Sequence, residues 1–126
     1  MISYTKRVVN YGKTKKLLVA DMTDPQQTIL SNLLTSEVPL FYSDIVKCLN
    51  AVLLNGEEKH EFAGNSCLIS ATKQSTRVER IIDGADIGEP CTVKTDELMS
   101  LVNEWHKELT VFRKKLIGEC DETKRI

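Results

Sequence analysis

A single apolar stripe in the last third of the chain constrains the fold more than any other feature. Its members recur at steps of one, three or four positions: Leu98, Leu101, Val102, Trp105, Leu109, Phe112 and Leu116. This spacing predicts one face of a helix of roughly 22 residues, which Thr95 caps and Gly118 ends. Because such a face has to cover another apolar layer, we expect Trp105 to be largely buried.

The segment before this helix changes to a period of two, which is typical of strands. Apolar and polar side chains alternate between Glu58 and Val93, with breaks near residues 64–65, 74–75 and 84–90. The alternating positions are His60 and Phe62, then Cys67, Ile69 and Ala71, then Val78, Arg80 and Ile82, and finally Cys91 and Val93. We therefore predict an antiparallel meander of three or four strands.

The first half of the chain predicts a hairpin and two short helices. Residues 2–9 and 15–22 alternate apolar and polar, and residues 10–13 between them supply a turn with a glycine. Asp24 can cap a helix over about residues 25–35 that begins with a proline. After Pro39, Ser43 can cap a second helix that closes at residues 55–56, an Asn-Gly pair.

The order of these elements favours an α+β fold: an N-terminal β-hairpin, two short helices, an antiparallel meander, and a long C-terminal amphipathic helix packed on the sheet. The 126 residues, 41% of them apolar and 28% charged, fit one globular domain over residues 1–126. We expect only the last six or so residues to be frayed.

The sequence predicts a cytoplasmic protein without a membrane segment. Its first residues lack the apolar run of a signal peptide, and its longest strictly apolar runs have four residues, far short of the roughly 20 that cross a bilayer. Four cysteines occur at wide and unequal spacings: Cys48, Cys67, Cys91 and Cys120. No CxxC pair suggests zinc or redox chemistry, so we expect reduced, buried thiols that react slowly in the native protein.

No sequence motif indicates a particular catalytic reaction, and we expect neither a cofactor nor a bound metal. Glycine-rich phosphate loops are absent, and the acids between Asp83 and Glu89 recur at steps of three, which does not fit a calcium loop. His106 lies among charged residues and is interpreted as a solvated side chain. Cys67 could approach His60 across a hairpin, so a small enzyme that uses this thiol and base remains an alternative.

Charge is distributed unevenly along a chain whose net charge is −1. Residues 1–22 carry +4, residues 23–62 carry −4 and residues 83–108 carry −5. The candidate partner-binding acids are Glu57, Glu58, Glu61, Asp83, Asp86 and Glu89, which loops at the strand ends could bring onto one rim. Such a rim suits a basic protein partner, because complementary fields favour encounter and reject like charges.

The basic residues of the predicted hairpin support a third hypothesis for the function. Its cations are Lys6, Arg7, Lys13, Lys15 and Lys16, and a nucleic-acid-binding regulator could use them. The hairpin holds two tyrosines as its only aromatic residues, and the whole chain has a pI near 6.1. We therefore keep nucleic acid as an alternative rather than as the expected partner.

Residues 62–70, 76–83 and 92–98, followed by the pattern LxxLVxxW that ends at Trp105, share a layout with a known class of proteins. Over about residues 62–112 the chain resembles the small cytosolic immunity proteins of bacterial polymorphic toxin systems, including contact-dependent growth inhibition. The resemblance implies a non-catalytic protein that neutralises one cognate toxin, with a nuclease as the expected class, by direct stoichiometric binding. It carries over no contact residue.

Overall fold

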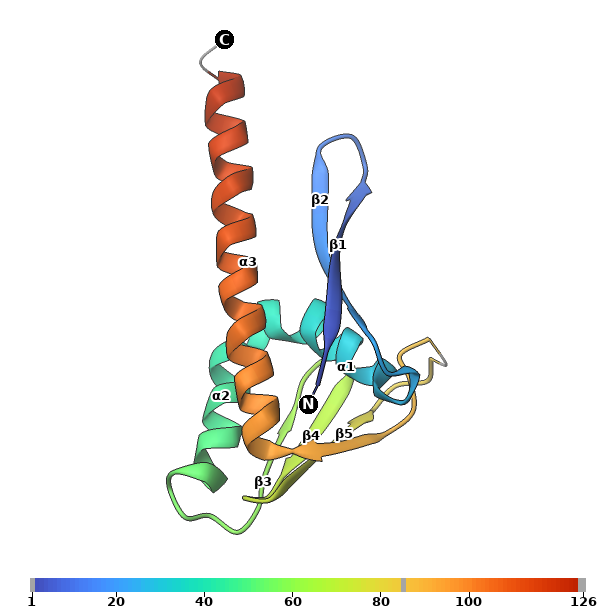
Figure 1. The fold of residues 1–126 in the computed structure, drawn as a ribbon, viewed down its shortest axis with the longest axis vertical. Helices are drawn as coiled ribbons and strands as arrows, with labels where there is room; N and C mark the ends of the chain where they lie inside the picture. The colour runs from blue at the N-terminus through green and yellow to red at the C-terminus, as the bar shows by residue number, and fades with distance from the viewer. Residues whose placement is uncertain (1, 85, 125–126) are drawn as a thin grey trace.

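The chain folds as α+β, with helices on one face of a four-stranded antiparallel sheet and a two-stranded hairpin beside the last helix (Figure 1). The computed structural model describes residues 2–84 and 86–124, and their side chains as far as residue 117. The architecture confirms the predicted fold class.

The hairpin consists of β1 (Tyr4–Tyr11) and β2 (Lys15–Met22), paired from Tyr4 opposite Met22 to Tyr11 opposite Lys15. Gly12 in the turn has φ +66°, a conformation that glycine adopts without strain. The two strands confirm the predicted hairpin, with the turn shifted by about two residues from its expected position. Figure 1 shows the hairpin extending away from the sheet, alongside the last helix.

One almost continuous helical segment follows the hairpin. It comprises η1 (Pro25–Gln27), α1 (Thr28–Asn32), the π-helical turn η2 (Leu33–Glu37) and α2 (Val38–Leu53). Asp24 caps its start as predicted, because its Oδ1 accepts the backbone N–H of Gln26 at 2.9 Å. Its end is also where the sequence predicts it, since Gly56 has φ +76° just beyond α2.

The predicted break between two separate helices is wrong. Pro39 lies in the first turn of α2, directly after the π-helical turn η2, so the helix accommodates the proline where its spacing changes, and Ser43 lies inside the helix instead of capping it. The chain bends without leaving the helix, through the wider turn of η2 and a kink at Phe41, whose φ is −126°.

The meander is the four-stranded sheet, in the order β3 (His60–Ala63), β4 (Cys67–Ala71), β5 (Ser75–Arg80) and β6 (Cys91–Lys94). One row of side chains crosses it on the face that packs against the helices: Phe62, Ile69, Val78 and Cys91. The strands confirm the period-two analysis, except that Ile82 lies beyond β5 and is half exposed.

The long helix α3 (Thr95–Lys124) lies across this face beside α2. Its stripe is buried from Leu98 to Leu109, and Trp105 is completely buried, as the sequence predicts. Gly118 does not end the helix, since one helical glycine costs only about 1 kcal/mol. The predicted frayed tail is helical as far as Lys124, and residues 125–126 lie outside the described part of the chain.

The predicted cap at Thr95 is also wrong. Its buried hydroxyl donates to the carbonyl of Thr72 and lies 2.8 Å from Oγ1 of Thr76, so it ties the start of α3 to the β4–β5 turn. The neighbouring carboxylate of Asp96 accepts the N–H of Glu97 at 2.8 Å.

Candidate functional site

The six predicted partner-binding acids do not form one rim. His60 pairs with Ala71, whereas Cys67 pairs with Arg80, so the start of β3 and the end of β5 lie at opposite ends of the sheet. Glu57, Glu58 and Glu61 cluster at the first of these ends. Asp83, Asp86 and Glu89 follow the second and are called the acidic loop below. Between the two groups the chain runs the length of the sheet three times, along β3, β4 and β5. Because these strands are antiparallel, the two groups of acids lie at opposite ends of the sheet.

The acids at the start of β3 are largely held by neighbouring side chains. Oε2 of Glu57 lies 3.1 Å from Nδ1 of His60. Glu61 accepts the hydroxyl of Ser70 at 3.1 Å and lies 3.6 Å from the ammonium group of Lys59. These contacts already engage two of the three carboxylates.

The acidic loop has fewer side-chain contacts. Asp83 and Asp86 are exposed, and no hydrogen bond or ion pair involves either carboxylate within residues 2–84 and 86–124. Glu89 lies 3.9 Å from Nη1 of Arg80, with 82% of its side chain exposed. The three negative charges of the acidic loop therefore face solvent, and neighbouring cations neutralise them only weakly.

Residues 84, 87 and 88 of this loop nevertheless make contacts that anchor them to the rest of the fold. Arg80 donates to the carbonyl of Gly84 at 3.1 Å, the N–H of Ile87 donates to that same carbonyl at 3.1 Å, and the Ile87 side chain is buried. Gly88 has φ +107°, and a Cβ there would lie only 2.7 Å from the backbone nitrogen of Ile29. Close packing on α1 thus holds the loop, and only glycine fits at that contact.

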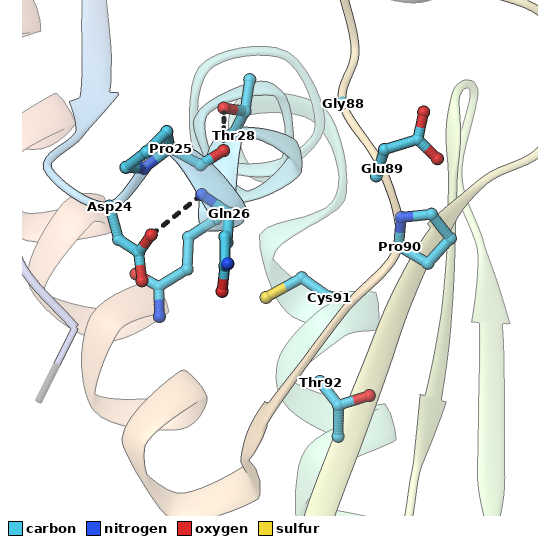
Figure 2. A pocket seen from close by; sticks show the side chains of 10 residues that line it. Asp24, Pro25, Gln26, Thr28, Gly88, Glu89, Pro90, Cys91 and Thr92 are labelled. Atoms are coloured by element: carbon cyan, nitrogen blue, oxygen red, sulfur yellow. Dashed lines mark hydrogen bonds between the residues drawn. The ribbon is translucent and has the colours of Figure 1, made fainter.

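Beside the loop lies an open cleft of about 640 Å³ between residues 24–28 and 88–92 (Figure 2). Figure 2 shows the Asp24 carboxylate turned back to Gln26 and the Cys91 side chain directed toward the cleft. Burial, followed by the charge of Asp24, raises the pKa of the Cys91 thiol, so this sulfur is a poor nucleophile at neutral pH.

The thiol and base proposed for an enzyme are not brought together. His60 lies opposite Ala71, four residues from Cys67 along β4, which corresponds to about 13 Å. Cys67 is buried, and that burial raises its pKa, although hydrogen bonds from Asn32 and Ser66 act in the opposite direction. Instead, Cys48 contacts His60, and its sulfur donates to the backbone carbonyl at 3.6 Å.

Cys48 is also unsuited to nucleophilic attack. Burial raises its pKa to about 11, and the charges of Glu57 and Glu61 add to the rise. The prediction of reduced, buried thiols agrees with the free, buried state of Cys48 and Cys67, whereas Cys91 is half-buried. The side chain of Cys120 lies outside the described residues.

The interpretation of His106 as a solvated side chain is wrong. Its ring stacks on Tyr42 with centroids 3.6 Å apart and an interplanar angle of 4°, and the Tyr42 hydroxyl donates to Oδ1 of Asn103 at 2.7 Å. The spacing of residues along α3 could not reveal this contact, because the contact depends on how α2 packs against α3. His106 therefore joins two helices instead of standing free as a base.

A buried polar cluster surrounds Glu37, and the sequence did not predict it. The Glu37 carboxylate, 1% exposed, accepts the N–H groups of Asn65 and Ser66 at 2.9 and 3.0 Å and the Ser66 hydroxyl at 2.8 Å. Nδ2 of Asn32 donates to the same hydroxyl at 2.7 Å. A Cβ on Gly64 would collide with Oε2 of Glu37. The cluster locks the β3–β4 turn onto η2, and the only sequence signal is an acid within an apolar helical run.

The cations near the base of the hairpin are paired. Lys6 bonds Glu108 on α3, and Nε of Arg7 lies 2.6 Å from Oδ2 of Asp21. Tyr4 packs edge-on against Trp105 with ring centroids 5.6 Å apart and donates to Glu104 at 3.1 Å. Burial and the acceptor Glu104 raise the pKa of Tyr4. These contacts fasten the base of the hairpin to α3.

Residues 2–84 and 86–124 contain neither a cluster of metal-ligating side chains nor a helix suited to crossing a bilayer. In that part of the chain, no three acids, cysteines or histidines gather into a group that could hold a metal ion. None of its helices combines the length and apolar character that a bilayer-crossing segment needs. Comparison with known proteins adds no relative: no family model, no curated protein and no solved structure matches this chain.

Proposed function

We propose that this chain is a non-catalytic binding protein of the immunity type, which neutralises a cognate bacterial toxin by stoichiometric occlusion. The acidic loop is the contact surface, and a basic region of the toxin is its target. The observation that carries the proposal is the combination of exposed carboxylates at Asp83 and Asp86 with a backbone anchored on Arg80, Ile87 and Gly88.

Anchoring matters because ordering a loop costs free energy when a complex forms. A loop that is already fixed in the free protein avoids this cost, and its charges are in place when a partner approaches. Poorly neutralised carboxylates also raise the rate of encounter with a basic surface and disfavour acidic competitors. Both properties suit an inhibitor that must capture one toxin quickly.

A binding role also agrees with the state of the nucleophiles and bases described above. The thiols of Cys48, Cys67 and Cys91 have raised pKa values and are protonated at neutral pH. His60 is engaged by Glu57, and His106 stacks on Tyr42. These arrangements do not supply the activated nucleophile that the Cys67–His60 alternative needs.

The test is calorimetric titration against the product of the adjacent gene, purified as a catalytically inactivated variant. We expect Asp83→Lys, Asp86→Lys and Glu89→Lys together to weaken a nanomolar complex by at least about a hundredfold, because three favourable contacts become repulsive. The fold should survive, since exposed loop carboxylates contribute little to stability. Circular dichroism checks this.

The opposite end of the sheet provides a matched control. Glu57→Lys, Glu58→Lys and Glu61→Lys make the same change in net charge, so a general electrostatic effect would weaken binding equally in both triple variants. Equal weakening, or full affinity in the acidic-loop variant, would move the interface elsewhere. If the wild-type protein does not bind, the immunity role is wrong for that pair.

A further inference from the structure

The hairpin and the part of α3 after Leu109 form two arms that rise together from the rest of the molecule (Figure 1). Between them lies an open cleft of about 580 Å³, called the arm cleft below. Its lining includes Val8 and Val111, which are 50% and 53% exposed, above a buried Leu18. Half-buried Phe112 and Leu116 continue this floor along α3.

Cationic side chains border this apolar floor. Lys6, Arg7, Lys16 and Lys115 line the arm cleft, against one carboxylate, that of Glu108. Lys6, Arg7 and Lys16 all have intramolecular partners, but Lys6 and Arg7 each keep more than half of the side chain exposed, so their charges still act on an approaching ligand. The cleft is therefore apolar at its floor and positive at its rim.

We propose that the arm cleft binds an acidic amphipathic helix of a partner protein. Aliphatic side chains on one face of that helix would cover Val8 and Val111, and carboxylates on its flanks would meet the cationic rim. This binding activity goes beyond the proposed immunity function. It involves no residue of the acidic loop, and its ligand is acidic, whereas the proposed toxin surface is basic.

The dimensions of the arm cleft set the length of the ligand. On β1 the lining runs from Lys6 to Asn10, and on α3 it runs from Glu108 to Leu116, each of which spans roughly 13 Å. A helix of about nine residues has this length. The occupant is thus a segment of two to three turns, and for so small a contact we expect an affinity in the micromolar range.

The lining favours a protein helix over a nucleic acid. Single-stranded nucleic acids are bound by exposed aromatic side chains on which bases stack, combined with cations that follow the phosphates. In the arm cleft, Phe112 is the aromatic residue, and it is half-buried, while the exposed floor is made by valines. Exposed valines gain free energy by contact with aliphatic groups and nothing from phosphates.

The experiment uses the full chain and a fluorescein-labelled synthetic peptide of about 12 residues, with leucine on one helical face and glutamate on the other. We expect a Kd of about 1–100 μM by fluorescence anisotropy and a gain of peptide helicity by circular dichroism. A scrambled peptide of the same composition should bind at least tenfold more weakly, and lysine in place of glutamate should abolish binding.

Two pairs of exposed aliphatic residues distinguish specific binding in the arm cleft from non-specific hydrophobic binding. Val8→Ser with Val111→Ser should weaken peptide binding at least tenfold, whereas Ile81→Ser with Ile82→Ser removes similarly exposed side chains outside the cleft and should change it less than twofold. Lys115→Glu should also weaken binding, by removing one charge of the rim.

Several results would overturn the proposal. Equal binding of the ordered and scrambled peptides would show charge attraction without a helical site. Equal loss in both serine variants would place the contact outside the arm cleft. A labelled DNA duplex or single-stranded RNA that binds through Lys115 while the peptide does not would replace the helix with a nucleic acid, and no peptide binding at about 1 mM would leave no helix site at all.

Discussion

The two halves of α3 meet different surroundings although they belong to one helix. In the first half the stripe packs against the sheet and α2, and Leu98 and Trp105 have no exposed surface. In the second half, which forms one arm, the stripe residues Phe112 and Leu116 are only half-buried, and Val111 and Ile117 beside the stripe keep more than half of their surface exposed. A helical period thus shows which face is apolar, but not how far along the helix another layer covers it.

The strands differ in the same way. The four-stranded sheet has helices on one face, whereas the hairpin is a two-stranded ribbon, which is marginally stable alone in water. Its base is held because Thr35 and Ser31 accept the N–H groups of Ala20 and Met22 at 3.1 and 3.0 Å. Toward the tip, Tyr11 and Leu17 are exposed. We expect the arms to open more readily than the rest of the molecule.

The largest effect should come from Trp105→Ala, which removes the largest fully buried side chain. We expect unfolding free energy to fall by about 3–5 kcal/mol, through lost packing and the cavity that remains. The loss also removes the contact of Tyr4, so the base of the hairpin should loosen with it. Urea unfolding measures the change, and an unchanged midpoint would contradict a buried stripe.

A smaller effect should appear as alkaline destabilisation around Cys48. Its pKa in the folded protein is about 11, against 9.0 as the ordinary value, so between these pH values the folded state keeps a proton that the unfolded chain has lost. Stability from this group is complete below about pH 9 and falls as the pH rises through 11. The stability advantage of wild type over Cys48→Ala should shrink across this range, and parallel curves would contradict the shift.

Periodicity was sufficient to predict most of the fold, because alternation and helical spacing follow directly from burial on one face. It placed the four strands and the apolar half of α3. It failed where the outcome depends on contacts distant in sequence. Pro39 is accommodated inside a helical segment, at the junction of η2 and α2, and the hydroxyl of Thr95 donates to the β4–β5 turn.

The candidate site was less predictable for the same reason. The strand register decides that Asp83 and Glu57 lie at opposite ends of the sheet, and no local pattern contains this information. The Glu37 carboxylate is bound by backbone N–H groups, which every residue except proline carries, so sequence gives no sign of them. The arm cleft joins residues about 100 positions apart.

The smallest effect should come from Val111→Ala, compared with Leu109→Ala two positions earlier on the same helix. Leu109 is 5% exposed, and its truncation should cost about 2–3 kcal/mol, because it removes buried contacts and leaves a cavity. At Val111, which is 53% exposed, little packing is lost, and alanine is the better helix former by a few tenths of a kcal/mol.

These two terms nearly cancel at Val111, so we expect its unfolding free energy to stay within about 0.5 kcal/mol of wild type. Urea midpoints for the two variants, measured side by side, distinguish the face of α3 that packs in the core from the face that lines the arm cleft. A cost at Val111 that equals the cost at Leu109 would mean that a layer covers the arm cleft in the free protein. That result would also exclude a helix from another protein at this surface, because the exposed valine to which it binds would already be buried.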